Sequence, residues 1–199
     1  VNGLMGIPGL LLGGIIGDAI MKRRRNGRMI VGAVAIVLSV PLILLSLWMP
    51  RGNVWGFAIF MGLGYAAMNV YYSTVYSTIQ DIIEPSLRGT AMALYFFAMY
   101  VLGASLGPYG TGLASDTFTE TAARRSGLTE LTYQSLEPFR AEGLHTAMYI
   151  IPVLGALLAL VLLAASRTVT KDQDNLQQWM KKSAAQSAAA SAAAAEQVK

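Results

Sequence analysis

Five long stretches of this sequence contain no internal charged residue. They cover residues 3–20, 29–48, 54–78, 89–114 and 146–165, with Asp18 near the end of the first. A helix of about 20 mostly apolar residues is long enough to cross the roughly 30 Å hydrocarbon core of a bilayer. None of the five alternates polar and apolar residues as a membrane β-strand does. The sequence therefore predicts an all-α fold, a polytopic membrane helix bundle.

The composition agrees with a membrane protein and is atypical of soluble classes. Only 13% of the 199 residues are charged, against about 25% in soluble domains, and the mean hydropathy is +0.49. An ordinary soluble enzyme, a coiled coil and a disordered chain are all poor matches. The sequence contains no cysteine, so it offers neither a disulfide nor a thiolate metal site. We expect no metal and no cofactor.

The basic residues are distributed unevenly between the segments that join the spans. Eleven of the 15 lie on one side: Lys22, Arg23, Arg24, Arg25 and Arg28 after the first span, Arg88 before the fourth, and Arg167, Lys171, Lys181, Lys182 and Lys199 after the fifth. The other side has Arg51, Arg124, Arg125 and Arg140. The positive-inside rule then predicts a plasma or inner membrane protein with a cytoplasmic C-terminus. Membrane orientation explains the positive charge, so we expect no nucleic-acid partner.

We expect two regions. Residues 1–166 form the transmembrane bundle, with a long outer loop over 115–145 in which Leu128, Leu131, Leu136 and Phe139 indicate short amphipathic helical turns. Residues 167–199 form a cytoplasmic tail. Because residues 183–195 are almost entirely Ala and Ser, we predict that this tail is disordered or weakly helical.

The segment between the first two spans contains a recognisable motif. Gly14 is followed after three residues by Asp18, then by a basic run and the pair Gly27-Arg28. A basic stop-transfer loop explains the arginines but not an acidic residue at the membrane edge. The segment resembles the loop signature of the major facilitator superfamily, although its Gly-Arg pair comes several residues later than usual.

Two further segments strengthen this resemblance. Residues 84–91, with Arg88 followed by Gly-Thr-Ala, are similar to the cytoplasmic entry into the family's eleventh helix. Gly103, Gly107 and Pro108 match a Gly-x-x-x-Gly-Pro segment for helix packing or a kink. The Spinster-like branch is the most similar. The resemblance implies helices eight to twelve of a twelve-helix transporter, whose missing N-terminal half would be a partner. It also implies that Asp18, Arg28 and Arg88 act in cytoplasmic gating.

One face of the third span carries polar and aromatic residues. Tyr65, Asn69, Tyr72 and Tyr76 recur at intervals of four, three and four residues, and the next span adds Tyr95 and Tyr100. Polar groups are costly in hydrocarbon, so this face should meet other helices or a wet cavity. Two interpretations follow, interhelical hydrogen bonding and substrate binding. The resemblance favours the second, because the family's tenth helix lines its central cavity.

Three functions remain open. The first is a transporter that works by alternating access on a small organic or amphiphilic solute, either lysophospholipid-like or sphingoid-like, as the resemblance implies, or an organic anion. The second is a membrane scaffold or sensor with the same fold. The third is an intramembrane serine hydrolase that uses Ser105 and His145, which we regard as remote. We expect membrane lipids as further partners. From residue 29 onward no span has an acidic or basic residue at its middle, so any coupling site would lie in the missing half, or transport is uncoupled.

Overall fold

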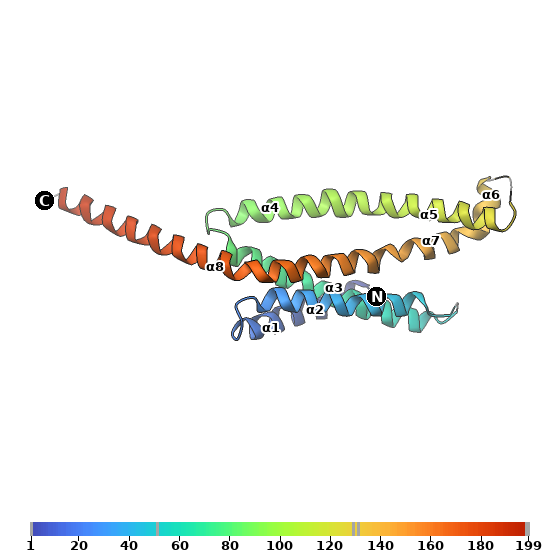
Figure 1. Ribbon diagram of the computed structural model, residues 1–199, viewed down its shortest axis with the longest axis horizontal. Coiled ribbons are helices and arrows are strands. Elements are labelled where there is room, and N and C mark those ends of the chain that lie inside the picture. Colours follow the sequence, from blue (N-terminus) through green and yellow to red (C-terminus); the bar gives the residue numbers. More distant parts are fainter. Residues whose placement is uncertain (1, 51, 129, 131, 198–199) are drawn as a thin grey trace.

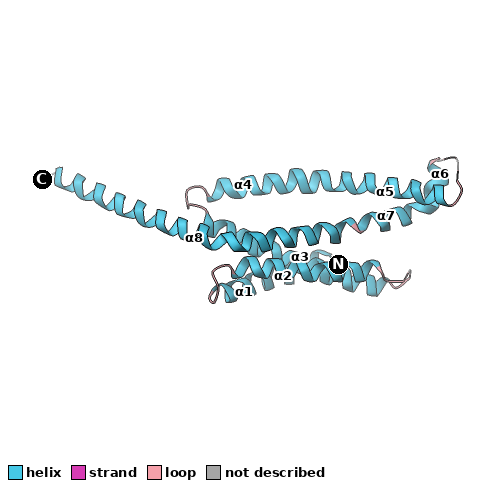
Figure 2. Cartoon of the chain, viewed as in Figure 1, coloured by secondary structure: helices cyan, strands magenta, loops and turns pink. Residues whose placement is uncertain are grey.

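The chain folds into helices (Figures 1 and 2). The computed structural model describes residues 2–50, 52–128, 130 and 132–197, so Arg51, Leu131 and Lys199 lie outside the described residues. The α-helices are α1 (Asn2–Met21), α2 (Gly27–Leu47), α3 (Val54–Ile82), α4 (Arg88–Ala98), α5 (Leu106–Arg125), α6 (Tyr133–Leu136), α7 (Arg140–Met148) and α8 (Ile150–Gln197); η1 (Met99–Ser105) is a π-helix and η2 (Glu137–Phe139) a 3-10 helix. The described part of the chain contains no strand, which confirms the predicted all-α class.

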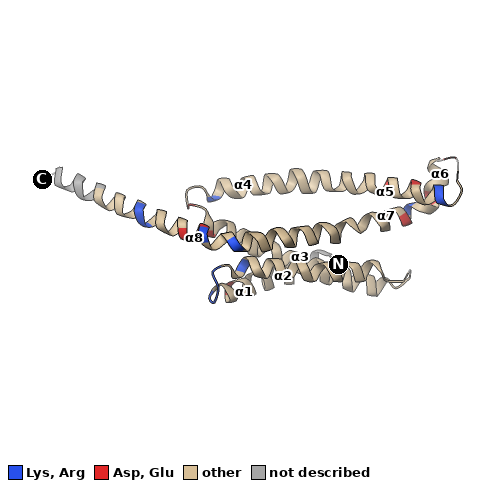
Figure 3. Ribbon diagram, viewed as in Figure 1, with Lys and Arg blue, Asp and Glu red and all other residues tan. Residues whose placement is uncertain are grey.

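The predicted spans fall in helical segments, although residues 89–114 run through α4, η1 and part of α5, and residues 146–165 cross from α7 to α8. Within the described residues, four helical stretches are long and apolar enough to cross a membrane: Gly27–Leu47, Val54–Ile82, Arg88–Arg125 and Tyr133–Ala189. The first predicted span corresponds to the shorter apolar helix Met5–Met21. The charged residues are concentrated in the turns at the ends of the bundle and rod helices and along the later part of α8, whereas the helices between these turns are almost free of charge (Figure 3).

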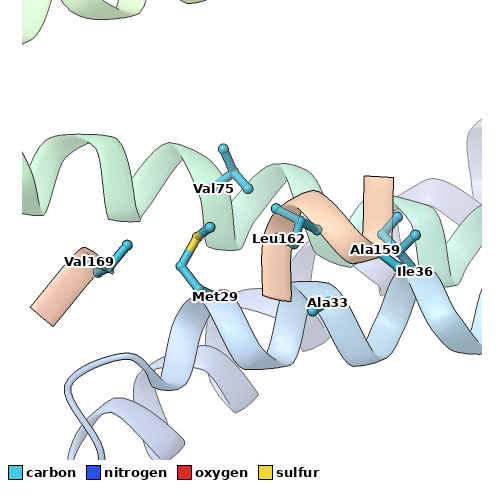
Figure 4. Packing of buried hydrophobic residues seen from close by; sticks show 7 residues of the cluster. All are labelled: Met29, Ala33, Ile36, Val75, Ala159, Leu162 and Val169. Atoms are coloured by element: carbon cyan, nitrogen blue, oxygen red, sulfur yellow. The ribbon is translucent and has the colours of Figure 1, made fainter. Parts of the chain in front are cut away.

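Helices α1, α2, α3 and α8 pack into a bundle in which α2 contacts the other three. Its core joins three helices (Figure 4): Met29, Ala33 and Ile36 of α2, Val75 of α3, and Ala159, Leu162 and Val169 of α8. Lipid tails are as apolar as these side chains, so close van der Waals packing rather than the hydrophobic effect holds such a bundle together within the bilayer.

Helices α4 and α5 form one continuous rod with η1 at its middle, the α4–α5 rod. The rod lies beside the bundle (Figure 1), and neither α4 nor η1 contains a buried residue. The π-helix ends at Ser105, three residues before Pro108. Because proline has no N–H for the carbonyl of Ala104 and its ring crowds that carbonyl, the hydrogen-bond register is disturbed in this turn.

The predicted outer loop is largely helical, which corrects the expectation for residues 115–145. Helix α5 continues to Arg125, where Gly127 with a φ of +89° ends it and the N–H of Leu128 bonds to the carbonyl of Ala123. Ala123 of α5 and Ala147 of α7 are fully buried. Small residues let α5 and α7 approach closely, so the two helices pack against each other as a hairpin.

Helix α8 also differs from the prediction. It begins at Ile150, just after α7 ends at Met148, because the ring of Pro152 excludes a bond to the Met148 carbonyl. It then continues to Gln197 through the segment expected to be disordered or weakly helical, so no break separates the predicted regions 1–166 and 167–199. Alanine has the highest helix propensity of all residues, which explains why the Ala/Ser stretch is helical here.

One seam of buried residues runs along α8. Its members recur every three or four residues: Pro152, Gly155, Ala159, Leu162, Ser166, Val169, Gln173 and Leu176. This spacing keeps a single face of the helix against its neighbours. The buried face therefore extends past the last predicted span into the segment that follows it.

Candidate functional site

Close packing of α1 on α3 positions one wall of the candidate site. A Cβ added to Gly9 would overlap the main-chain carbonyl of Ala66, and one added to Gly13 would lie 2.8 Å from the carbonyl oxygen of Val70. At Gly6 the nearest atom would be a ring carbon of Tyr65, 3.2 Å away. Glycines at these positions let the two backbones meet, which is the role of small residues between membrane helices.

A cavity of about 560 Å³ lies where α1, α3 and η1 meet. Its lining consists of Leu10 from α1, of Asn69, Tyr72 and Tyr76 from α3, and of Met99, Tyr100, Gly103 and Ala104 from η1. The volume falls within the range of small-molecule sites. The lining offers phenol hydroxyls, an amide and a thioether, and none of its residues is ionised at neutral pH.

Aromatic rings form a continuous cluster around this cavity. The ring of Tyr76 lies 5.9 Å from Tyr72, 5.5 Å from Tyr95 and 5.3 Å from Phe96, measured between centroids. The hydroxyls of Tyr71 and Tyr95 are 2.9 Å apart and share a hydrogen bond. Edge-to-face aromatic pairs of this kind hold their rings in fixed orientations, so the cluster joins α3 to the α4 end of the α4–α5 rod.

Four of the six residues predicted to bind substrate line the cavity: Asn69, Tyr72, Tyr76 and Tyr100. Tyr65 lines a second, mostly apolar cavity of about 530 Å³ with residues of α2, α3, α7 and α8. Tyr95 directs its hydroxyl to Tyr71 instead. The amide of Asn69 is buried and donates to the carbonyl oxygen of Tyr65 at 2.8 Å. Tyr76 both lines the cavity and donates from its hydroxyl to Sδ of Met99 in η1 at 3.9 Å, so interhelical bonding and a cavity occur together on this face. Substrate binding there stays a prediction.

A group of charged residues joins the ends of α1, α2 and α3. Arg28 donates to Asp18 from Nε at 3.1 Å and from Nη2 at 2.7 Å, and its Nη1 pairs with Asp81. Arg28 is the most buried of the three, with 20% of its side chain exposed. We call Asp18, Arg28 and Asp81 the ion triad. One guanidinium has enough donors in a fixed fork to serve both carboxylates at once.

The sequence reasoning missed Asp81, and Arg88 does not join the triad. Arg88 donates from Nε to the carbonyl of Ile83 at 3.2 Å and lines a cavity of about 200 Å³ that also contains Asp81. Asp81 directly follows the polar face of the third span and sits, like Asp18, at the end of an apolar stretch. An acidic residue at the end of an apolar stretch is therefore the sequence feature that indicates Asp81 as a partner of Arg28.

The predicted packing residues Gly103, Gly107 and Pro108 have no bundle helix against them. A Cβ at Gly103 or Gly107 would have no heavy atom within 4 Å among the described residues. Gly103 instead lines the cavity, and Pro108 follows the π-helix. Whether a further helix packs on these glycines stays a prediction.

The two residues of the hydrolase hypothesis make other hydrogen bonds. Ser105 donates from Oγ to the carbonyl of Tyr100 at 3.2 Å, and Nε2 of His145 lies 2.8 Å from the carbonyl oxygen of Leu47. Nucleophilic catalysis by serine needs a base within hydrogen-bond reach of the hydroxyl. The described arrangement does not join these side chains.

Comparison with known proteins identifies the chain's relatives. Residues 1–108, just over half of the chain, match the model of the family described as Major Facilitator Superfamily. An "MFS-type efflux pump" of Mycolicibacterium smegmatis is 30% identical over 127 residues, 60% of this chain and 27% of that protein. "Protein spinster homolog 1" of Homo sapiens is 28% identical over 113 residues, 57% of this chain and 21% of that protein. "Protein spinster" of Drosophila melanogaster is 25% identical over 130 residues, 64% of this chain and 21% of that protein.

These matches agree with the resemblance found in the sequence, including its similarity to Spinster proteins. They also agree with a multi-pass membrane protein, as the apolar helices indicate. The chain spans only 21–27% of the length of these three relatives. Its helices are therefore comparable to one part of such a protein.

Proposed function

Since this chain belongs to the major facilitator superfamily, we propose that it forms part of a secondary transporter that moves a small organic or amphiphilic solute by alternating access. In this mechanism two helix bundles rock about a binding site at their interface. The cavity lined by Asn69, Tyr72, Tyr76 and Tyr100 is the observation that carries the proposal. The rest of the protein would supply the opposite wall.

The chemistry of the lining favours an amphiphilic or weakly polar solute. Tyrosine hydroxyls and the Asn69 amide can hydrogen bond to a polar group, while Leu10, Met99 and the aromatic rings suit an alkyl or ring portion. None of the eight lining residues carries a charge that would compensate an ionic solute. An organic anion would therefore need its cationic partners outside this chain.

The ion triad provides a closing contact on the cytoplasmic side. We assign that side from the distribution of Lys and Arg, which also puts the helical extension of α8 in the cytoplasm. Arg28 joins α2 to α1 and α3 at their ends, so these helices move as one unit when the bundle rocks. The side chain of Asp18 is exposed to solvent. It can in addition accept hydrogen bonds from the N-terminus of a helix in the other half of the protein.

Transport explains the cavity better than the two competing functions do. A scaffold needs no polar cavity lined by hydroxyls and an amide, and a sensor with such a cavity would bind a solute without moving it across the membrane. A serine hydrolase needs a Ser–His hydrogen bond, whereas Ser105 and His145 bond to separate main-chain carbonyls. Solute flux in proteoliposomes that contain the full-length protein separates transport from both: a scaffold shows none with any solute, and a hydrolase reacts with a fluorophosphonate probe.

Removing a polar group from the cavity should weaken apparent solute affinity. We expect Tyr72→Phe and Asn69→Leu each to raise the KM for transport about three- to tenfold, since a lost hydrogen bond costs about 1 kcal/mol. The measurement is initial uptake against solute concentration in proteoliposomes, corrected for the amount of protein. Tyr133→Phe is the matched control, because it removes a hydroxyl from α6, outside the cavity lining. Unchanged KM in both cavity variants would contradict substrate binding at this face.

A further inference from the structure

The part of α8 that follows the last predicted span packs against the turn that joins α1 to α2. Arg25 in this turn pairs with Asp174, and its Nη2 donates to Oε1 of Gln177 at 3.0 Å. Gln173 donates from Nε2 to the main-chain oxygen of Arg25 at 3.4 Å. Asn26 donates from Nδ2 to the main-chain oxygen of Ser166 at 3.2 Å. Four contacts of different kinds thus join two consecutive residues of the turn to one helix.

The buried seam of α8 explains why this helix can hold the turn. Ser166, Val169, Gln173 and Leu176 are all buried, although they follow the last apolar span. Val169 belongs to the bundle core, so the extension is anchored and does not project freely at this point. Gln173 is a buried amide whose donor is used on the turn, and leaving it without a partner would be costly.

The anchored turn leads directly into the ion triad. Asn26 is the residue before α2, and its side chain makes no capping bond to that helix because it bonds to Ser166 of α8. Gly27 begins α2 against the backbone of Ile20, where a Cβ would come within 2.8 Å. Arg28 follows in the same helical turn. Arg28 follows residues 25 and 26 by only two to three positions. Contacts that fix these two residues therefore also fix the start of α2 and the guanidinium of Arg28.

We propose that Asp174, together with Gln173, is a positioning residue for the ion triad. By fixing Arg25 and Asn26, the α8 extension sets where α2 begins and therefore keeps Arg28 between Asp18 and Asp81. The effect on transport rests on the proposed function of the triad, whereas the positioning itself does not.

The charges around this contact distinguish Asp174 from its neighbours. Asp172 lies two residues away, on nearly the opposite side of the helix, and lines a different cavity with Glu84 and Trp179. Lys22, Arg23 and Arg24 of the turn are exposed, and none of them is in an ion pair among the described residues. Asp172→Asn changes the charge of the extension as Asp174→Asn does, which makes it a matched control.

Distances between spin labels test the positioning without any transport assay. The full-length protein, in a background without other cysteines, is labelled at positions 24 and 86, which are both exposed and lie in the turns before α2 and before α4. We expect Asp174→Asn to broaden and shift the distance distribution and Asp172→Asn to leave it as in the unmutated protein. Exchanging the charges, with Arg25→Asp and Asp174→Arg together, should restore a narrow distribution. A distribution that is the same in Asp174→Asn and Asp172→Asn would overturn the proposal.

Transport then tests the connection to the triad. We expect Asp174→Asn to lower the initial transport rate about two- to fivefold, the range for one half-exposed ion pair, and to cause no further fall once Arg28→Ala is present. A further fall of the same size in that background would overturn the route through Arg28. If the distances change while transport is unaffected, the positioning stands and the role of the triad in transport fails.

Discussion

Gly9→Ala should destabilise the protein far more than Gly14→Ala, although both substitutions add one methyl group to the same helix. At Gly9 the new Cβ would overlap the main-chain carbonyl of Ala66 and come within 2.9 Å of its carbon. Backbone atoms cannot move aside as the end of a side chain can, so α1 must separate from α3. Overpacking of this kind costs about 1–3 kcal/mol. Thermal unfolding in detergent, followed by size-exclusion chromatography, measures the difference in Tm.

Gly14 is the control that the chain itself provides. A Cβ there would have no heavy atom within 4 Å among the described residues, and alanine improves helix propensity by up to about 1 kcal/mol. We therefore expect Gly14→Ala to have an unchanged or slightly higher Tm. Gly13→Ala should resemble Gly9→Ala, because the carbonyl oxygen of Val70 would lie 2.8 Å away. Equal Tm values for Gly9→Ala and Gly14→Ala would show that α1 and α3 do not meet in this way.

Replacing Arg28 with glutamine should reduce transport about 10- to 100-fold while leaving membrane insertion intact. The substitution removes the only cation of the ion triad and leaves the Asp18 and Asp81 carboxylates near each other without a partner. Hydrogen bonds to charged groups contribute about 1.5–3 kcal/mol each, which corresponds to this range of rates. Initial uptake per amount of protein in the membrane is the measurement.

Related variants test whether the triad, rather than positive charge alone, is responsible. Arg23→Gln removes a charge from the same turn at an exposed position and should transport like the unmutated protein. Arg28→Lys keeps the charge but lacks the guanidinium fork, so we expect an intermediate rate. Asp18→Ala should lower transport without preventing insertion. Normal uptake by both Asp18→Ala and Arg28→Gln would exclude a closing contact at the triad.

The spans and much of the cavity wall follow from local patterns in the sequence. The lack of charge over residues 54–78 reports a membrane helix directly, because charged groups are costly in hydrocarbon. The intervals between Asn69, Tyr72 and Tyr76 put these side chains on one face of any helix, and the structure joins them in one cavity. Tyr65 shares that face in the sequence but lies at another cavity, because the neighbours at its level include α2. Intervals along one helix do not determine which neighbour is met at each turn.

The ion triad was only partly predictable, because the apolar pattern of the third span ends before Asp81. Asp81 belongs to α3, which continues to Ile82, whereas an estimate from apolar length ends the span at Thr78. The pairing of Arg28 with Asp81 joins residues 53 positions apart. Such a contact depends on how α2 and α3 pack, and no local pattern encodes it.

The helical extension of α8 was missed for a different reason. Its seam alternates apolar Leu162, Val169 and Leu176 with polar Ser166 and Gln173, so polar residues interrupt the apolar pattern at two of these five buried positions. Low complexity alone predicts a disordered or weakly helical tail for the Ala/Ser stretch that follows the seam, although alanine strongly favours a helix. Polar residues that are buried against main-chain partners are the least visible in a sequence.

The α4–α5 rod gives the cavity two walls of unequal stiffness. The rod is supported near its ends, where α4 meets α3 and α5 meets α7, and its π-helical middle faces the cavity with Met99, Tyr100 and Gly103. Because it is supported at both ends, the rod can bend at η1 at the expense of a few main-chain hydrogen bonds. Such bending does not separate the residues of the bundle core. The facing wall on α3 is held by packing against α1 and by the ring contacts of Tyr76 with Tyr95 and Phe96 at the α4 end of the rod. In the proposed transporter we therefore expect this cavity to accept solutes of different widths that place their polar group next to Asn69 and Tyr72.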